Sequence, residues 1–351
     1  MGSNRVFAVA SPETAAHASA LLAALGPRAA GMFQEIRQEP TIGLFHVVLA
    51  AARDARADAV AGVGGGSVLD VAKLVAAFLR SSQRLDDVFG AGLLAPRTTP
   101  LACLPTTSGT GSEVSPNALL LDENTSQKRA VISPHLVPDA AFVDAELAVS
   151  MPPAVTATTG MDALSHCVES YTNVHAHPAV DIYALEGIRL AGAGLVAAFQ
   201  DGSDMSARAS MSRASLYGGL CLGPVNTAAA HALGYPLGAE YHVAHGLSIA
   251  VLLPHVMEFN LPAATERYAR ISQALGAAPG RSQEETAANG VARVRAIAHS
   301  IGADRRLSSF GITSSDIPRL AEAAMKVTRL LVNNPRPLTQ ADAEGIYRSA
   351  L

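Results

Sequence analysis

The sequence contains no tryptophan, few other aromatic residues and little charge. Of its 351 residues, 5% are aromatic and 16% are charged. So few aromatic side chains offer little stacking surface to single-stranded nucleic acids. With 26 basic and 30 acidic residues, the chain also has no positive excess to attract phosphate backbones or anionic lipids. We therefore expect no nucleic-acid partner and no membrane partner.

Cysteine is also scarce. The three cysteines, Cys103, Cys167 and Cys221, stand far apart and are odd in number. This argues against a disulfide framework and against a cysteine-based zinc site. Residues 1–6 contain no long apolar segment of the kind that a secretory signal needs. Together these features predict a cytoplasmic location.

Apolar residues are plentiful, at 49%, and the length suits about two domains. Short apolar runs at 5–10, 58–63, 101–105 and 140–143 alternate with helical patterns at 13–25, 41–55 and 68–79, which predicts a parallel sheet with helices on both faces. Helical patterns then cover 152–172, 178–200, 205–221, 246–260, 263–275, 283–301, 316–327 and 339–349. We expect an α/β domain over residues 1–151 and an all-helical domain over residues 152–351.

Residues 214–239 form a long stretch without charge. Glycine and proline interrupt it repeatedly, which a membrane-spanning helix would rarely tolerate at this density. We expect this stretch to be a buried, irregular helical segment.

Two glycine-rich turns follow predicted strands. Gly64-Gly65-Gly66-Ser67 lies between a strand and a helix, and residues 106–112 follow the strand at 101–105. Bare glycines let the backbone approach a pyrophosphate, and N–H groups at a helix start point toward an anion. Neighbouring parallel strands end at one edge of the sheet, where such folds bind their ligands. The pair therefore predicts a dinucleotide site; an ordinary tight turn and a flexible loop are the alternatives.

The helical half contains a candidate metal site. Asp162 and His166 are four residues apart, so on a helix both project from one face. His231 and His245 follow. One carboxylate and three imidazoles make a donor set suited to Fe²⁺ or Zn²⁺. The alternative is that each histidine is a surface residue or a hydrogen-bonded core residue, because this Asp/His spacing often arises by chance.

In their order along the chain, these motifs resemble the iron-containing, or group III, alcohol dehydrogenase family. The resemblance spans the whole chain. It is carried by Gly64-Gly65-Gly66-Ser67-x2-Asp70-x2-Lys73, Pro105-Thr106-Thr107-x-Gly109-Thr110-Gly111-Ser112-Glu113, Gly160-x-Asp162-Ala163-Leu164-x-His166-x2-Glu169-x-Tyr171, His231-x13-His245-Gly246 and Asn333-Asn334-Pro335-Arg336.

This resemblance implies a dehydroquinate synthase-like fold, in which an NAD(P)-binding α/β domain precedes a helical metal-binding domain with the active site in the cleft, and it implies a homodimer. It implies one Fe²⁺, or in some cases Zn²⁺, held by Asp162, His166, His231 and His245. It implies that NAD or NADP is bound by Gly64, Gly65, Gly66, Ser67, Asp70, Thr106, Thr107, Thr110 and Ser112. The implied reaction is hydride transfer between a small-molecule alcohol and its aldehyde or ketone, with the metal polarising the substrate oxygen.

The chain departs from the family pattern at two positions. Many members carry a further histidine four residues after the third metal ligand, as a proton relay; here that position is Tyr235. His242 could substitute for it, or could be a surface histidine. NAD-preferring members commonly have an Asp after the second strand, and the matching residue here is Gln34, which leaves NADP use open; Glu35 beside it could still favour NAD.

Other functions remain as alternatives. The N-terminal segment resembles the maleylacetate reductase branch of the family, although that branch often lacks the metal-binding Asp. A dehydroquinate synthase-like lyase would need several basic residues in its cleft, and residues 105–113 and 160–171 contain no lysine or arginine. A non-catalytic nucleotide-binding protein has no need for four intact metal ligands. The substrate, its physiological direction and the bound metal stay open.

Overall fold

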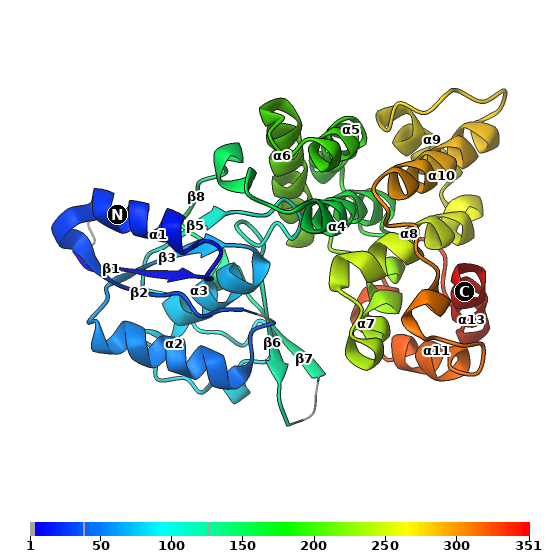
Figure 1. Ribbon diagram of the computed structural model, residues 1–351. Helices are drawn as coiled ribbons and strands as arrows, with labels where there is room; N and C mark the ends of the chain where they lie inside the picture. The colour runs from blue at the N-terminus through cyan, green and yellow to red at the C-terminus, as the bar shows by residue number, and fades with distance from the viewer. Residues whose placement is uncertain (1–3, 38, 125–126) are drawn as a thin grey trace. The chain divides into compact units, whose positions relative to one another are not determined.

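The computed structural model describes residues 4–37, 39–124 and 127–351. The chain forms two compact units, which Figure 1 colours from blue to blue-green and from green to red. The first comprises residues 1–107 and 111–148, and the second comprises residues 108–110 and 149–351. The predicted boundary between residues 151 and 152 lies close to this division. The short stretch 108–110, by contrast, belongs to the second unit.

A parallel five-stranded sheet organises the first unit, with the strand order β2-β1-β3-β5-β8. The strands are β1 (Val6–Ala10), β2 (Ala29–Phe33), β3 (Ala59–Gly64), β5 (Leu101–Pro105) and β8 (Ala140–Ala141). The α/β prediction is therefore confirmed. In a doubly wound sheet of this order, ligands bind at the carboxyl edge where the order reverses, between β1 and β3.

Helices cover both faces of this sheet. Successive side chains of β1 point to opposite faces, so each face offers apolar residues for a helix to pack on. Phe7 and Val9 pack in a cluster with α2 (Ile42–Asp54) and α3 (Gly66–Phe78), whereas Ala8 and Ala10 pack against α1 (Ala15–Leu25). Figure 1 shows α1 and α2 on opposite sides of the strands. Small alanines on one face and larger residues on the other let helices approach both faces of the sheet.

A second, three-stranded sheet was not expected from the sequence. It has the order β4-β7-β6, in which β6 (Asn117–Asp122) and β7 (Gln127–Ile132) form an antiparallel hairpin and β4 (Gly90–Ala91) pairs with β7 in parallel. The turn of this hairpin contains residues 125–126, which lie outside the described part of the chain. The hairpin follows the second glycine-rich turn, so its start helps to set the path of that turn.

The second unit is helical, as predicted. Its helices are α4 (Pro153–Thr172), α5 (Pro178–Gln200), α6 (Met205–Leu222), α7 (Ala229–Tyr241), α8 (His245–Asn260), α9 (Thr265–Ala274), α10 (Gln283–Ser300), α11 (Ile317–Met325), α12 (Thr328–Leu331) and α13 (Gln340–Ala350). Fifteen of the 20 residues of α4 are buried, so α4 is a central helix rather than an amphipathic surface one. The uncharged stretch 214–239 forms the end of α6, a loop and most of α7.

Two segments, α5 and residues 245–263, are long and apolar enough to cross a bilayer by length and composition. About half of each apolar window, 50% and 56%, is buried within the protein. Core helices pass the same test, so these two segments alone are weak evidence for a membrane.

Candidate metal centre and cofactor turn

The metal-ligand candidates lie on three helices of the second unit. Asp162 and His166 are one turn apart on α4, His231 lies in the first turn of α7, and His245 is the first residue of α8. The Nε2 atoms of His166, His231 and His245 lie 3.6, 3.4 and 3.5 Å from the same oxygen, Oδ1 of Asp162. Ligand atoms of Asp162, His166 and His231 all lie within 4.8 Å of one another. The structure thus brings all four predicted residues together.

The donor atoms fit a cation better than they fit one another. Asp162 Oδ1 and His231 Nε2 are buried and have no hydrogen-bond partner among the described residues. Separations of 3.4–3.6 Å are too long for good N–H···O hydrogen bonds. Buried polar atoms are rarely left unpaired in this way. A divalent ion between the carboxylate and the imidazoles would satisfy these atoms together, so the residues fit the metal that the resemblance implies.

The electrostatics of the cluster also favour positive charge. Burial tends to raise the pKa of Asp162, but the imidazoles of His166, His245 and His231 hold that pKa below its ordinary value. Burial tends to lower the pKa of His231, and Glu169 and Asp162 outweigh burial and raise it to about 10. Without a metal ion, a proton on His231 therefore supplies the positive charge that the carboxylates attract.

His245 forms the open side of the cluster. The side chains of Asp162, His166 and His231 are 4–6% exposed, whereas that of His245 is 32% exposed. A small molecule therefore reaches the cluster from the side of His245.

Close helix packing sets the spacing of the ligands. A Cβ atom on Gly246, directly after His245, would overlap the carbonyl oxygen of Thr158 in α4, and one on Gly218 of α6 would lie 3.0 Å from Cβ of His166. A side chain on Gly246 would push α8 away from α4, and one on Gly218 would crowd the side chain of His166. Gly246 therefore lets α8 approach α4 closely enough for His245 to meet Asp162, and Gly218 leaves room for the side chain of His166.

One residue of this site was missed from the sequence. Glu169 appeared in the family motif but received no role. In the structure it follows Asp162 and His166 on the same face of α4, and its Oε2 contacts Nδ1 of His231. The spacing i, i+4, i+7 was the available signal, because it places all three side chains on one stripe of a helix.

Tyr235 and His242, the predicted proton-relay residues, occupy different environments. The ring of Tyr235 lies 6.0 Å from that of His245, centroid to centroid, and its hydroxyl accepts a hydrogen bond of 3.1 Å from Arg329. His242 is exposed at the end of α7, where its φ of 54° is left-handed. Contact with a metal-ligand candidate therefore favours Tyr235 over His242.

The first glycine-rich turn leads from β3 into α3. Gly65 is the N-cap residue of α3, and no side chain among the described residues caps this helix. N–H groups of a first helical turn lack acceptors within the helix, so this turn is suited to an anion. A Cβ atom on Gly64 would lie 2.6 Å from Cβ of Val68, and one on Gly65 would lie 3.1 Å from Thr107. Glycine is therefore required here by close packing as well as by access to a ligand.

The second turn begins beside the first. The N–H of Thr106 donates to the carbonyl of Gly64 at 3.1 Å. Ser108, Gly109 and Thr110 then belong to the helical unit, where the hydroxyl of Ser108 lies 3.2 Å from that of Ser212 in α6. The turn thus divides into a part at the sheet edge, with Thr106 and Thr107, and a part on the helices, with Thr110.

Asp70 and Ser112 interact with each other inside the α/β unit. Asp70 accepts hydrogen bonds from the Ser112 hydroxyl, at 2.6 Å, and from the N–H of Leu119 in β6, at 3.0 Å. Lys73, one turn further along α3, is fully buried and donates to two main-chain carbonyls just before and at the start of β6, both at 2.9 Å. These bonds shape the segment 112–119. Direct contact of Asp70 or Ser112 with the cofactor stays a prediction.

Gln34 lies directly after the edge strand β2 and is exposed. The neighbouring Glu35 is also exposed and pairs with Arg37 at 2.8 Å. The charge of Glu35 is therefore partly neutralised, and Gln34 itself carries none.

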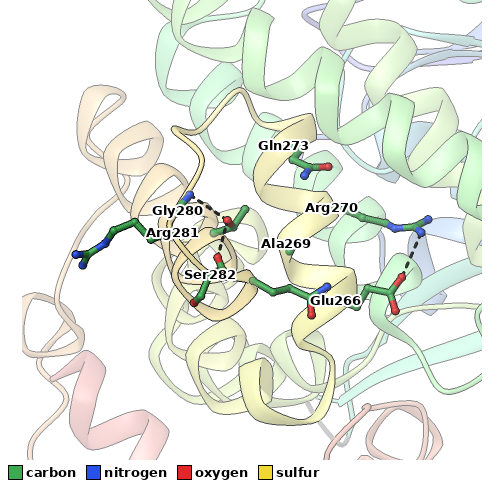
Figure 2. Close-up of a pocket in the computed structure, with 9 residues that line it drawn as sticks. Glu266, Ala269, Arg270, Gln273, Gly280, Arg281 and Ser282 are labelled. Atoms are coloured by element: carbon green, nitrogen blue, oxygen red, sulfur yellow. Dashed lines mark hydrogen bonds and ion pairs between the residues drawn. The ribbon is translucent and has the colours of Figure 1, made fainter.

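An open hollow on the helical unit lies apart from these residues. Figure 2 shows its lining, which comes from α9, the loop after it and the start of α10, with Arg270 paired to Glu266. It encloses about 800 Å³, open solvent included. It contains no candidate ligand and no cysteine or histidine, so it does not contribute to the site described above.

Comparison with known proteins gives a consistent result. Residues 1–145 match the family model for iron-containing alcohol dehydrogenase, and residues 156–351 match the model for the C-terminal part of the Fe-containing alcohol dehydrogenase family. A long-chain-alcohol dehydrogenase from Geobacillus thermodenitrificans is 40% identical over 323 residues, which cover 91% of this chain and 81% of that protein.

Solved structures agree with these matches. The crystal structure of a 1,3-propanediol oxidoreductase superposes with a TM-score of 0.95 at 31% identity, covering 100% of this chain and 93% of the other. A sulfoacetaldehyde reductase from Bifidobacterium kashiwanohense, solved in complex with NAD⁺, gives a TM-score of 0.91 at 26% identity and covers 100% and 92%.

Proposed function

This chain belongs to the iron-containing alcohol dehydrogenase family, and from that premise we propose its reaction, the reversible transfer of a hydride between a small-molecule alcohol and a nicotinamide cofactor. The chain is an oxidoreductase that interconverts an alcohol with an aldehyde or ketone, using NAD or NADP and a divalent metal ion. The observation that carries our assignment of residues is the convergence of three Nε2 atoms on one oxygen of Asp162.

We infer that Asp162, His166, His231 and His245 hold the metal. One carboxylate and three neutral imidazoles leave a divalent ion with positive charge, and the bound ion supplies a Lewis acid that polarises the substrate oxygen. His245 borders the open side of the cluster, so a substrate approaching from there meets Tyr235 as well.

We infer that Tyr235 passes the proton. When an alcohol is oxidised, its hydroxyl proton must leave as the hydride departs from carbon. The hydroxyl of Tyr235 can release its own proton toward solvent and take up the proton from the substrate in its place. The N–H that Arg329 donates to this oxygen stabilises the negative charge it carries between the two transfers. His242, exposed at the end of α7, would be a second carrier nearer the solvent.

We infer that the α/β unit binds the cofactor. Gly64, Gly65, Gly66 and Ser67 would hold its pyrophosphate at the start of α3, with Thr106 and Thr107 as neighbouring hydroxyl donors. Contacts of Thr110 and Ser112 with the cofactor stay predictions. Gln34 at the end of β2 has no charge to repel a 2′-phosphate. We therefore propose that NADPH is accepted as well as NADH.

We also propose that the enzyme acts in the cytoplasm and as a homodimer. All three cysteines are buried and none forms a disulfide, which suits a reducing compartment. Light scattering of the purified holoenzyme tests the dimer, and a monomer at working concentrations would contradict it.

The function is tested by metal-dependent activity. The metal-free protein is reconstituted anaerobically with Fe²⁺ or Zn²⁺ and assayed with short alcohols, aldehydes and maleylacetate, using NADH and NADPH, before and after chelation. We expect reduction of aldehydes that a chelator abolishes and added metal restores. Reduction of maleylacetate that persists after chelation would instead assign the protein to the maleylacetate reductase branch.

A pair of histidine variants sharpens this test. His245→Ala should lose metal and hydride transfer while still binding the cofactor, measured by the fluorescence of NADH. His299→Ala is the matched control, because His299 is an exposed histidine of the same unit, away from the cluster, that pairs with Asp304. Full metal-dependent activity in His245→Ala would refute the ligand assignment.

A further inference from the structure

Glu169 contacts both the main chain at the start of α7 and the imidazole ring of His231. It is 3% exposed, and both carboxylate oxygens are engaged. Oε1 accepts hydrogen bonds from the N–H groups of Ala228, Ala230 and His231, at 3.1, 2.7 and 3.4 Å. Oε2 contacts Nδ1 of His231. One side chain of α4 therefore binds both the start of α7 and the ring of a metal-ligand candidate on α7.

The start of α7 needs such an acceptor. Its N-cap residue is Ala228, whose side chain cannot accept a hydrogen bond, and the first N–H groups of a helix have no acceptor within the helix. Glu169 provides that acceptor from another helix. Its negative charge also lies at the positive end of the α7 dipole.

The contact with Nδ1 determines how the ring of His231 can bind a metal. A carboxylate can only accept, so the hydrogen of a neutral imidazole lies on Nδ1, and Nε2 presents its lone pair toward Asp162. Carboxylates that hold a metal-bound histidine in this way fix its tautomer and orientation.

We propose that Glu169 is a positioning residue that sets the affinity of this site for its metal, by holding His231 in the binding tautomer and anchoring the start of α7. This rests on the proposed function, because it takes Asp162 and the three histidines as the metal ligands. Glu169 itself does not touch the metal.

The loop before α7 has further anchors, so the fold does not depend on Glu169 alone. Ser170 donates to the carbonyl of Asn226, at 3.1 Å, and Asn173 donates to the carbonyl of Val225, at 3.2 Å. Asn333 donates to the carbonyl of Thr227 at 2.8 Å. These three side chains hold residues 225–227 whether or not residue 169 carries a charge.

Glu169→Gln separates the two roles. Glutamine has a single carbonyl oxygen, which can replace Oε1 in front of three N–H groups, while its NH₂ group then faces Nδ1 of His231. That amide donates where the carboxylate accepted, so the hydrogen of the imidazole moves to Nε2 and blocks the metal position. The variant keeps the helix anchor and reverses the tautomer.

The experiment measures metal binding rather than turnover. Metal-free wild type, Glu169→Gln and the control Glu186→Gln are titrated with Zn²⁺ against a chelating indicator, and thermal unfolding is recorded with and without the ion. Glu186 forms an exposed ion pair with Arg189 on α5. We expect Glu169→Gln to bind Zn²⁺ about 10- to 100-fold more weakly, with a smaller metal-induced rise in Tm, and Glu186→Gln to match wild type.

The outcomes of this experiment distinguish failure of the positioning role from failure of the proposed function. Wild-type affinity in Glu169→Gln would overturn the positioning role while leaving the proposed function intact. Wild type that binds no divalent ion would overturn both. If Glu169→Gln fails to fold, Glu169→Asp replaces it in the titration, because its shorter carboxylate keeps the accepting chemistry but cannot reach both partners. Affinity equal to wild type in that variant would also count against the proposal.

Discussion

Both units of the molecule bury charged side chains, but they differ in whether the buried atoms have hydrogen-bond partners. In the α/β unit, Lys73 is fully buried and makes three hydrogen bonds to Ser115 and Asn117. In the helical unit, Asp162 Oδ1 and His231 Nε2 are equally buried but have no hydrogen-bond partner among the described residues. Burial alone therefore does not identify a ligand site. Whether the buried atoms are already satisfied separates a cluster that shapes the fold from one that needs a ligand.

The largest loss of activity should come from a substitution in the cluster of Asp162, His166, His231 and His245, in which two buried ligand atoms have no hydrogen-bond partner within the described part of the chain. Asp162→Asn removes the negative charge on which three imidazoles converge. We expect the purified variant to contain almost no metal and its turnover to fall more than about 100-fold. Removing even a residue that only hydrogen-bonds to a metal ligand lowers metal affinity or activity by about 10- to 100-fold. Elemental analysis and steady-state assays measure this. A variant with full metal content would show that the carboxylate is not a ligand.

Removing Lys73, whose hydrogen bonds are already made within the α/β unit, should lower the stability of the protein and leave its metal content unchanged. Lys73→Met leaves Asp70 buried without its positive neighbour 4.0 Å away, and should lower the free energy of unfolding by about 3 kcal/mol. Urea unfolding measures this, with metal content as the contrasting readout. The double variant Asp70→Asn with Lys73→Met should recover part of the loss. Equal losses in the double and single variants would argue against coupling of the pair.

A buried carboxyl of the α/β unit should give that unit a pH-dependent stability. Burial raises the pKa of Glu113 from 4.5 to about 7. Between these values the folded protein binds more protons than the unfolded chain, so the free energy of unfolding falls as pH rises from about 4.5 to 7. Glu113→Gln should remove on the order of 2 kcal/mol of this fall. Urea unfolding at several pH values tests this, and an unchanged slope would contradict it.

A smaller effect is expected at the open side of the metal cluster. Tyr235→Phe removes the hydroxyl that Arg329 contacts while keeping the ring beside His245. Because Tyr235 is only half-buried, water can replace part of its role, so we expect turnover to fall about tenfold with metal content unchanged. Assays with and without a deuterated solvent test whether proton transfer slows. Unchanged turnover would remove Tyr235 from the relay.

The smallest effect is expected at the edge of the sheet. Gln34→Asp adds a negative charge at an exposed position after β2. A charge pair in solvent at contact distance is worth about 1 kcal/mol, so the ratio of kcat/KM for NADPH to that for NADH should fall about fivefold. Arg37→Gln is the control for the neighbouring ion pair. No change in the ratio would mean that the 2′ position of the cofactor lies elsewhere.

The apolar runs of the sequence predicted four of the five strands of the parallel sheet, all except β2, and did not predict the hairpin of β6 and β7. The strands expected at 5–10, 58–63, 101–105 and 140–143 overlap β1, β3, β5 and β8, because buried parallel strands are continuous apolar runs. In contrast, β7 reads Gln-Lys-Arg-Ala-Val-Ile, and its first residues are exposed. A strand that is half in solvent has no apolar run to detect.

The helical site shows a similar limit. Asp162 and His166 were readable because they are four residues apart on a predicted helix, whereas the role of Glu169 on the same stripe was missed. The structure brings Asp162 to His231 and His245. The helix α7 itself was not separated from the surrounding uncharged stretch, because it contains Gly234, Pro236 and Gly238. Its start is held by a carboxylate 59 residues earlier in the chain. No local pattern contains that information.

The close packing at Gly246 has a consequence for which metal ion this protein carries when it is isolated from cells. Because α8 packs directly on the backbone of α4 at Gly246, we expect the distance between His245 and the ligands on α4 to adjust little between ions of similar radius. Nitrogen and oxygen donors bind Zn²⁺ more tightly than Fe²⁺ in the general affinity order of divalent metals. The metal that is bound should then depend on which metal is available while the protein is made. Protein produced in zinc-rich medium should carry zinc, and iron occupancy should require iron to be abundant during synthesis.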